Sequence, residues 1–145
     1  MKKNIIEENE ESKDFINLAV VRDEEGRVLM VRRKEEEKGS DGSILKWAFP
    51  GGGQCPNETR EECVQRKVLC RTGYSVESIK QIDLRMNPQF SVMIVYHLCQ
   101  LLSSELAAEP SESYKIAEMR WVDPSEIRGL ITTTLNPEVA KELGI

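Results

Sequence analysis

Residues 52–74 read GGQCPNETREECVQRKVLCRTGY, and this stretch decides the fold. Thr59 is followed three residues later by Glu62, which is the pattern of a capping box at the start of a helix. Gly73 stands where glycine commonly ends a helix, because the residue after the last turn often adopts a left-handed conformation. The sequence therefore predicts a helix that begins after Thr59 and ends at Gly73.

The segments around this helix have the composition of strands and turns. Residues 15–22 and 27–33 flank a turn at 23–26, which predicts a hairpin. Residues 91–102 form a long apolar run that we interpret as a strand buried on both faces. Further expectations are a polar loop over 34–46, a short strand ending in a glycine-rich turn at 51–53, a strand over 118–122, and helix starts at Asp123-Pro124 and Asn136-Pro137. Strands mixed with two or three helices predict an α/β or α+β sandwich.

Length and composition are those of one domain. The chain has 145 residues, and we read residues 1–13 as a flexible charged tail and residues 14–145 as the domain. No apolar run approaches the ~20 residues of a membrane span, and the first residues lack an apolar signal-peptide core. We therefore expect a cytoplasmic location and no membrane partner. The net charge of −5 argues against nucleic acid as a partner.

The four cysteines contain no CxxC pair, so we expect reduced thiols rather than disulfides or a zinc site. His97 lies within the long apolar strand and is interpreted as an inner-strand histidine with satisfied hydrogen bonds. Trp47 and Tyr114 are considered as walls for a base, but packing explains Trp47 and a loop position explains Tyr114 equally well.

Six residues in the stretch 52–74 match one motif without a gap. The motif is G-x5-E-x7-R-E-U-x-E-E-x-G-U, where U is a bulky apolar residue, and the matches are Gly52, Glu58, Arg66, Val68, Gly73 and Tyr74. The stretch thus resembles the Nudix box of the MutT-like hydrolases. The resemblance covers nearly the whole chain after the tail. It implies an α/β fold, the Nudix α/β/α sandwich with a mixed sheet, and a ligand in which a nucleoside diphosphate is linked to another moiety.

The chain departs from the motif at its three central glutamates, which are replaced by Lys67, Cys70 and Arg71. In the family, those carboxylates hold the Mg²⁺ ions that bridge the diphosphate and activate water. The three positions fall within about a 100° arc of one helix face. Three glutamates would give that face −3, whereas Lys67, Arg71 and a neutral thiol give +2. We therefore expect no metal site and no cofactor, with standard Mg²⁺-dependent hydrolysis lost or impaired.

A nucleotide-diphosphate binder is the preferred hypothesis. Lys67 and Arg71 would take over the charge role of Mg²⁺, and the glycine turn would offer backbone N–H groups to phosphate oxygens. The alternative that Lys67 and Arg71 pair with nearby glutamates on a vestigial surface is left open. The expected ligand-binding residues are Gly51, Gly52, Gly53, Arg66, Lys67 and Arg71.

Two other functions remain open. An active Mg²⁺-dependent pyrophosphohydrolase would need non-standard carboxylates, for which Glu58 and Glu118 are the candidates. Glu58 also has a simpler role available, as an ion-pair partner of Arg66. A protein-interaction role on a vestigial fold is the third hypothesis. A homodimer is expected only from the resemblance, because many members of the family dimerise.

Overall fold

The computed structural model describes residues 14–38, 42, 44–87, 91–132 and 134–145. Its elements run in the order β1 (Phe15–Arg22), β2 (Val28–Lys38), β3 (Ile44–Ala48), β4 (Gly51–Gly53), α1 (Arg60–Thr72), β5 (Val76–Asn87), β6 (Val92–Leu101), η2 (Ser113–Lys115), β7 (Ile116–Val122), η3 (Pro124–Glu126), α2 (Ile127–Leu130) and α3 (Pro137–Leu143). The predicted tail, residues 1–13, lies outside the described residues.

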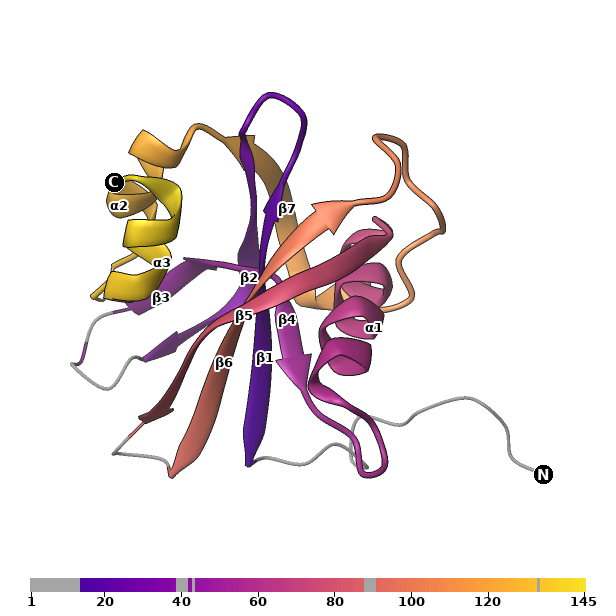
Figure 1. The fold of residues 1–145 in the computed structure, drawn as a ribbon, viewed down its shortest axis with the longest axis horizontal. Helices are drawn as coiled ribbons and strands as arrows, with labels where there is room; N and C mark the ends of the chain where they lie inside the picture. Colours follow the sequence, from indigo (N-terminus) through magenta and orange to yellow (C-terminus); the bar gives the residue numbers. More distant parts are fainter. Residues whose placement is uncertain (1–13, 39–41, 43, 88–90, 133) are drawn as a thin grey trace.

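The strands form one mixed sheet around β1 (Figure 1). The main order is β3-β2-β1-β6-β5, with β4 paired to β1 and β7 paired to β2. β1 and β6 are parallel from Phe15 with Met93 to Arg22 with Gln100, and the other pairings are antiparallel. The predicted hairpin is confirmed, since Arg22 and Val28 pair across a turn.

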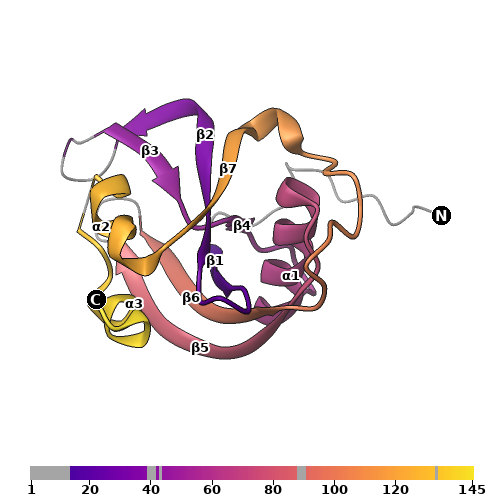
Figure 2. The ribbon, with the colours of Figure 1, turned by 90° about the horizontal axis from the view of Figure 1, so that it is seen from above.

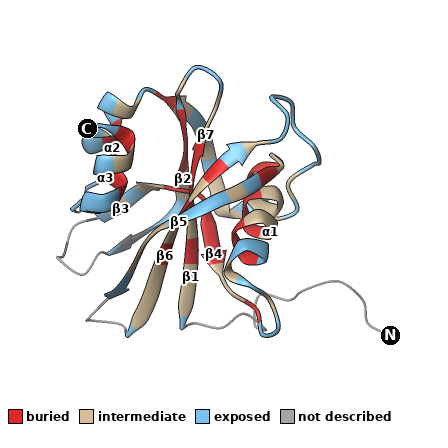
Figure 3. Cartoon of the chain, viewed as in Figure 1, coloured by how far each residue is buried: buried red, intermediate tan, exposed pale blue. Residues whose placement is uncertain are grey.

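Helices cover both faces of the central strands (Figure 2). On one side α1 packs Val64 and Val68 against Ala19 and Leu29. On the other side α2 and α3 pack against a second cluster, which includes Met30. Figure 3 shows buried residues concentrated in the strands and on the inner sides of the helices. The expected α/β sandwich with a mixed sheet is confirmed.

The predicted helix ends are confirmed at α1. The Thr59 hydroxyl accepts from the Glu62 N–H at 3.0 Å, and the Glu62 carboxylate accepts from the Thr59 N–H at 2.9 Å. Gly73 ends the helix with φ of 86°, in the left-handed region that favours glycine. Asp123 and Asn136 likewise cap the short helices that follow them, each with proline in the first turn.

Three predictions of local structure are wrong. The polar loop expected over 34–46 is shorter, because β2 continues to Lys38 and β3 begins at Ile44. The glycine-rich turn is instead strand β4, which pairs with β1. Glycine is required there, since a Cβ on Gly51 would lie 2.0 Å from the Asn17 carbonyl oxygen. The apolar run at 91–102 is strand β6 (Val92–Leu101), but full burial is limited to alternate residues in its second half.

Candidate functional site

The site lies where β4 packs against α1. Lys67 is fully buried there. Its aliphatic stem lies over Gly52, because a Cβ on Gly52 would come within 2.3 Å of the Lys67 Cε atom. Gly52 therefore lets the lysine lie inside the molecule, between the helix and the sheet.

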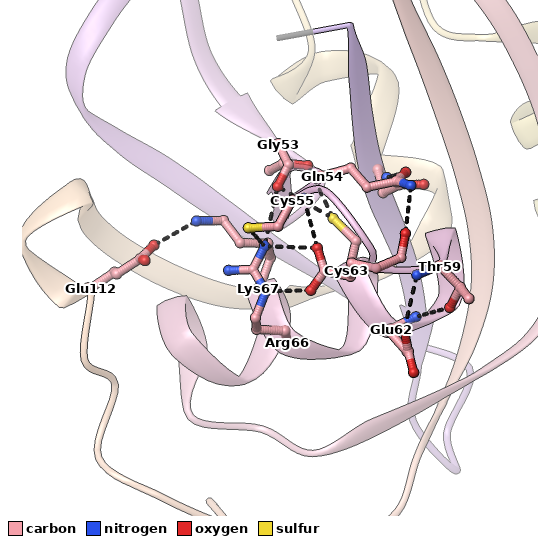
Figure 4. Close-up of polar contacts among 12 residues, drawn as sticks. Gly53, Gln54, Cys55, Thr59, Glu62, Cys63, Arg66, Lys67 and Glu112 are labelled. Atoms are coloured by element: carbon pink, nitrogen blue, oxygen red, sulfur yellow. Dashed lines mark hydrogen bonds and ion pairs between the residues drawn. The ribbon is translucent and has the colours of Figure 1, made fainter. Parts of the chain in front are cut away.

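Glu112 forms ion pairs with both cationic side chains of this helix face, Lys67 and Arg71. One oxygen of its carboxylate, Oε1, lies 2.9 Å from the Lys67 Nζ atom and 3.0 Å from the Arg71 Nε atom. The Arg71 Nη1 atom also donates to the Gly51 carbonyl at 2.8 Å. Burial alone would raise the pKa of Glu112, but the hydrogen bonds and charges of Lys67 and Arg71 outweigh it and hold that pKa below its ordinary value. Glu112 is therefore a carboxylate bridging an ammonium and a guanidinium (Figure 4 draws the Lys67 contact).

The segment that carries Glu112 connects β6 to β7 and crosses the C-terminal end of α1. The N–H groups of Ala107 and Ala108 donate to the Gly73 carbonyl at 2.8 and 3.2 Å. The Glu112 N–H donates to the Cys70 carbonyl at 2.8 Å. These bonds satisfy carbonyls that the last turn of a helix leaves without an intrahelical partner.

Glu58 and Arg66 form a second ion pair at the start of α1. Their closest atoms, Arg66 Nε and Glu58 Oε2, are 2.6 Å apart, and the Cys55 N–H donates to Glu58 Oε1 at 2.8 Å. Burial would raise the pKa of Glu58, but these partners outweigh it and lower that pKa. Arg66 also donates to the Gly53 carbonyl at 3.2 Å. The ion pair that the sequence left open for Glu58 is confirmed.

A chain of buried and partly buried hydrogen bonds runs from the sheet to Glu58. His97 Nε2 lies 2.9 Å from Asn17 Oδ1, and Asn17 Nδ2 donates to Gln54 Oε1 at 3.0 Å. Gln54 Nε2 then donates to the Glu58 carbonyl at 2.8 Å. Because Asn17 presents its oxygen to His97, the imidazole carries its proton on Nε2 and accepts at Nδ1 from the Ser78 hydroxyl, 3.1 Å away. The prediction of a satisfied His97 is confirmed.

Glu118, the second carboxylate candidate, lies on the other face of the sheet. In β7, Trp121 contacts Tyr74 and pairs with Leu29 on the α1 side. Side chains alternate along a strand, so Glu118 points to the α2 and α3 side. There it accepts from Arg32 at 3.3 Å and from Arg120 at 3.1 Å. The structure therefore does not bring Glu58 and Glu118 together.

The predicted ligand-binding residues gather around β4 and α1. Lys67 and Arg71 pair with a glutamate there, which is the alternative that the sequence left open. The glycine backbone groups are part of a strand, and the Gly51 and Gly53 carbonyls accept from arginines. Lys67 is buried rather than part of an exposed cationic patch. Their role in binding stays a prediction. The residues that assemble here are Gly51, Gly52, Gly53, Arg66, Lys67 and Arg71.

The resemblance to the family implies a magnesium site, but the side chains on this face of α1 do not fit that ion. Mg²⁺ requires hard oxygen ligands with few competing cations. Here Lys67 and Arg71 flank the Glu112 carboxylate, and Arg66 holds Glu58. Within the described ranges no group of three or more His, Cys, Asp or Glu side chains is placed to hold a metal ion.

Sequence reasoning did not single out Glu112, Asn17 or Gln54. Glu112 is one of three glutamates in residues 102–115, and only the hydrogen bonds of that segment to the end of α1 identify it. Asn17 carried a signal, because a polar residue within an apolar strand needs a buried hydrogen-bond partner.

Comparison with known proteins identifies the family of the fold. A family model of the NUDIX domain matches residues 16–142. This chain belongs to the Nudix family. The Nudix domain is 26% identical over 108 residues to a Bacillus subtilis (strain 168) protein provisionally named an 8-oxo-dGTP diphosphatase. That match covers 74% of this chain and 65% of the relative, so the chain spans slightly less than two thirds of that protein.

Solved structures share the fold. The MutT protein from Methanosarcina mazei Go1 is similar with a TM-score of 0.61 and 25% identity, over 90% of this chain and 89% of that one. A NUDIX hydrolase from Nitrosomonas europaea gives a TM-score of 0.72 at 19% identity, over 90% and 69% of the two chains. Among the described residues of this Nudix domain, no helix is long and apolar enough to span a membrane.

Proposed function

We propose that this Nudix domain binds a nucleoside-diphosphate compound without hydrolysing it by the Mg²⁺-dependent route of its family. The observation that carries the proposal is the ion-pair network of Lys67, Glu112 and Arg71 on the helix face where the motif has glutamates. The name of the Bacillus subtilis relative supports the ligand class, since a diphosphatase acts on a compound that contains linked phosphates.

Electrostatics argue against a metal at this face. Two unit charges about 4 Å apart interact by about 4 kcal/mol at the dielectric of a protein surface. Lys67 and Arg71 would each repel a divalent cation placed between them, and Glu112 supplies only one carboxylate. The same two cations favour an anion, because arginine and lysine donate charge-assisted hydrogen bonds to phosphate oxygens.

The test is calorimetric titration of the purified chain with ADP-ribose and with 8-oxo-dGTP, in EDTA and then in Mg²⁺. We expect binding that is independent of Mg²⁺, and no product when the same mixtures are chromatographed. The double variant Lys67→Met and Arg71→Ala should weaken binding at least tenfold. Lys80→Met with Arg85→Ala is the matched control, because it removes the same charges from exposed positions on β5.

Each alternative outcome has a distinct meaning. Equal affinity in the double variant and the wild type would exclude direct contact by Lys67 and Arg71. Mg²⁺-dependent product would identify an active hydrolase with non-standard carboxylates, the function for which Glu58 and Glu118 were the candidates. Absence of binding by any nucleotide in either buffer would move the assignment to an interaction role on the Nudix fold.

A further inference from the structure

We infer that Glu112 occupies the position of a ligand phosphate on α1, so that a diphosphate enters by displacing the segment that carries it. We call residues 102–115 the strap. The inference rests on the proposed function and adds a competition to it: the chain's own carboxylate and the ligand contend for Lys67 and Arg71.

The chemistry of the contact supports the comparison with a phosphate. A single carboxylate oxygen, Glu112 Oε1, receives an ammonium at 2.9 Å and a guanidinium Nε at 3.0 Å. An oxygen of a phosphate group would form charge-assisted hydrogen bonds with these same two donors. Glu112 therefore contacts the same two side chains, Lys67 and Arg71, that the proposed function assigns to ligand binding.

Because Lys67 and Arg71 are largely buried, the Glu112 carboxylate and a ligand phosphate cannot both bind them at the same time. The Lys67 side chain is 0% exposed and the Arg71 side chain is 19% exposed. A ligand outside the closed strap has no access to the Lys67 ammonium. Binding through both cations therefore requires that Glu112 withdraws.

The strap is built to move without unfolding the sheet. Its residues 102–109 are all exposed, and strands β6 and β7 anchor its two ends. Its contacts with the end of α1 are surface contacts. Ala107 and Ala108 donate to the carbonyl of the C-cap Gly73, and Leu106 and Pro110 lie beside that glycine. Glu112 contacts Cys70, Lys67 and Arg71. Segments with exposed backbone and few buried apolar contacts open at a small fraction of the global unfolding free energy.

Competition lowers the measured affinity in a calculable way. When only a fraction of molecules has the strap open, the apparent dissociation constant is the intrinsic one divided by that fraction. Glu112→Gln keeps the size of the side chain and removes its charge. We expect this variant to bind ADP-ribose and inorganic pyrophosphate at least tenfold more tightly than the wild type. Glu109→Gln is the matched control, since it removes the same charge from an exposed position of the same strap and should leave affinity unchanged.

Hydrogen exchange of the wild-type chain gives a second readout that needs no variant. Peptides covering residues 102–115 should exchange faster when ADP-ribose is bound, because the amides of Ala107, Ala108 and Glu112 lose their carbonyl partners on α1. The two titrations and the exchange experiment together separate the inference from the proposed function.

Tighter binding by Glu112→Gln together with faster hydrogen exchange of the strap would support both the inference and the proposed function. Wild-type binding with unchanged or slower strap exchange, or with equal or weaker affinity in Glu112→Gln, would overturn the inference and leave the proposed function standing. Binding by Glu112→Gln alone would support the inference and overturn the proposed function for the unmodified chain. No binding by either protein would overturn both.

Discussion

Lys67 places an ammonium group inside the protein at a position where the Nudix motif has a carboxylate. An unpaired buried charge is strongly unfavourable, so Lys67 depends on the carboxylate of Glu112. Glu112 in turn keeps Arg71 as a second partner. The contact is therefore asymmetric, because Glu112 has two cationic partners. Removing the charge of Lys67 should cost less stability than replacing it with a negative charge.

This asymmetry predicts an order of stabilities. Lys67→Met retains most of the stem and should lower the free energy of unfolding by about 1.5–3 kcal/mol, the range for a hydrogen bond to a charged group. Lys67→Glu buries a second carboxylate beside Glu112 and should lower it by at least about 3–5 kcal/mol. Urea denaturation measures both.

The control is a double-mutant cycle with Glu112→Gln. In that background Lys67→Glu no longer faces a like charge and should cost at least about 1 kcal/mol less than it does alone. Equal costs in the two backgrounds would mean that positions 67 and 112 are not energetically coupled, and the described contact would then contribute nothing to stability.

The ion pair of Glu58 and Arg66 predicts a dependence on pH. The folded-state pKa of Glu58 lies below its ordinary value of 4.5, so its stabilisation is complete above about pH 4.5 and is lost as pH falls through the folded pKa. Glu58→Gln should lower the unfolding free energy by about 1.5–3 kcal/mol at pH 7. The difference from the wild type should shrink when the same denaturation is repeated at pH 3.5. A difference that stays constant with pH would show that the charge of Glu58 is not what stabilises the pair.

At the scale of elements, the contact of β4 with α1 depends on the absence of a side chain at Gly52. Gly52→Ala would bring a Cβ to 2.3 Å from Lys67 Cε, with two further stem atoms at 3.3 Å. Since Lys67 has no exposed side to move into, we expect a loss of about 1–3 kcal/mol, the usual cost of overpacking. Thermal or urea unfolding measures it.

Gly129→Ala is the matched control for that substitution. Gly129 lies within α2, and a Cβ there meets nothing within 4 Å. Alanine should stabilise this helix by up to about 1 kcal/mol, because glycine is unfavourable within helices. If Gly52→Ala were as well tolerated as Gly129→Ala, Lys67 would have space that the described packing does not give it.

The elements also show where the sequence was informative. Both ends of α1 could be predicted, because Thr59, Glu62 and Gly73 act through local hydrogen bonds and backbone geometry. Strand β4 could not be predicted, because glycine does not favour strands. The β1 residues with which β4 pairs lie 30 or more positions earlier in the chain. Strand β5 was also missed. It is the last strand of the main order, and exposed Ile79 and Met86 obscure its alternation.

The candidate site could be predicted only in part for the same reason. Residues 52–74 identify the helix face and the substitution of its glutamates. The partner of Lys67 and Arg71, Glu112, lies more than 40 residues further along the chain. Its contact depends on the path of the strap, which a single sequence does not determine. The sequence alone does not show which glutamate of this segment pairs with Lys67 and Arg71.

At the scale of the whole molecule, buried and partly buried polar groups connect the sheet to the site. The hydrogen bonds from Ser78 through His97, Asn17 and Gln54 reach the backbone of Glu58 and pass through β5, β6 and β1. Each member leaves a partner unsatisfied if it is removed, at a cost of about 1–3 kcal/mol. The network therefore joins the stability of the central strands to the position of the loop before α1.

His97 makes this network sensitive to acid, which gives the last prediction. Burial lowers the pKa of His97, an effect opposed by the charge of Glu61 and supported by that of Arg60. The unfolded chain binds a proton near pH 6.5, while the folded chain keeps the imidazole neutral to a lower pH. Stability from the neutral imidazole is therefore complete above about pH 6.5 and falls as the solution is acidified through the folded pKa. Wild-type urea midpoints should decline between pH 7.5 and pH 5.

The matched variant for this prediction is His97→Gln, whose amide can donate to Asn17 and accept from Ser78 without titrating. It should be less stable than the wild type at pH 7.5, because the smaller side chain packs less well, and its midpoint should change less between pH 7.5 and pH 5. Glu58 and Glu112 do not account for a decline in this range, since both have lowered pKa values and remain ionised. Parallel pH profiles for His97→Gln and the wild type would therefore assign the acid sensitivity to groups outside this network.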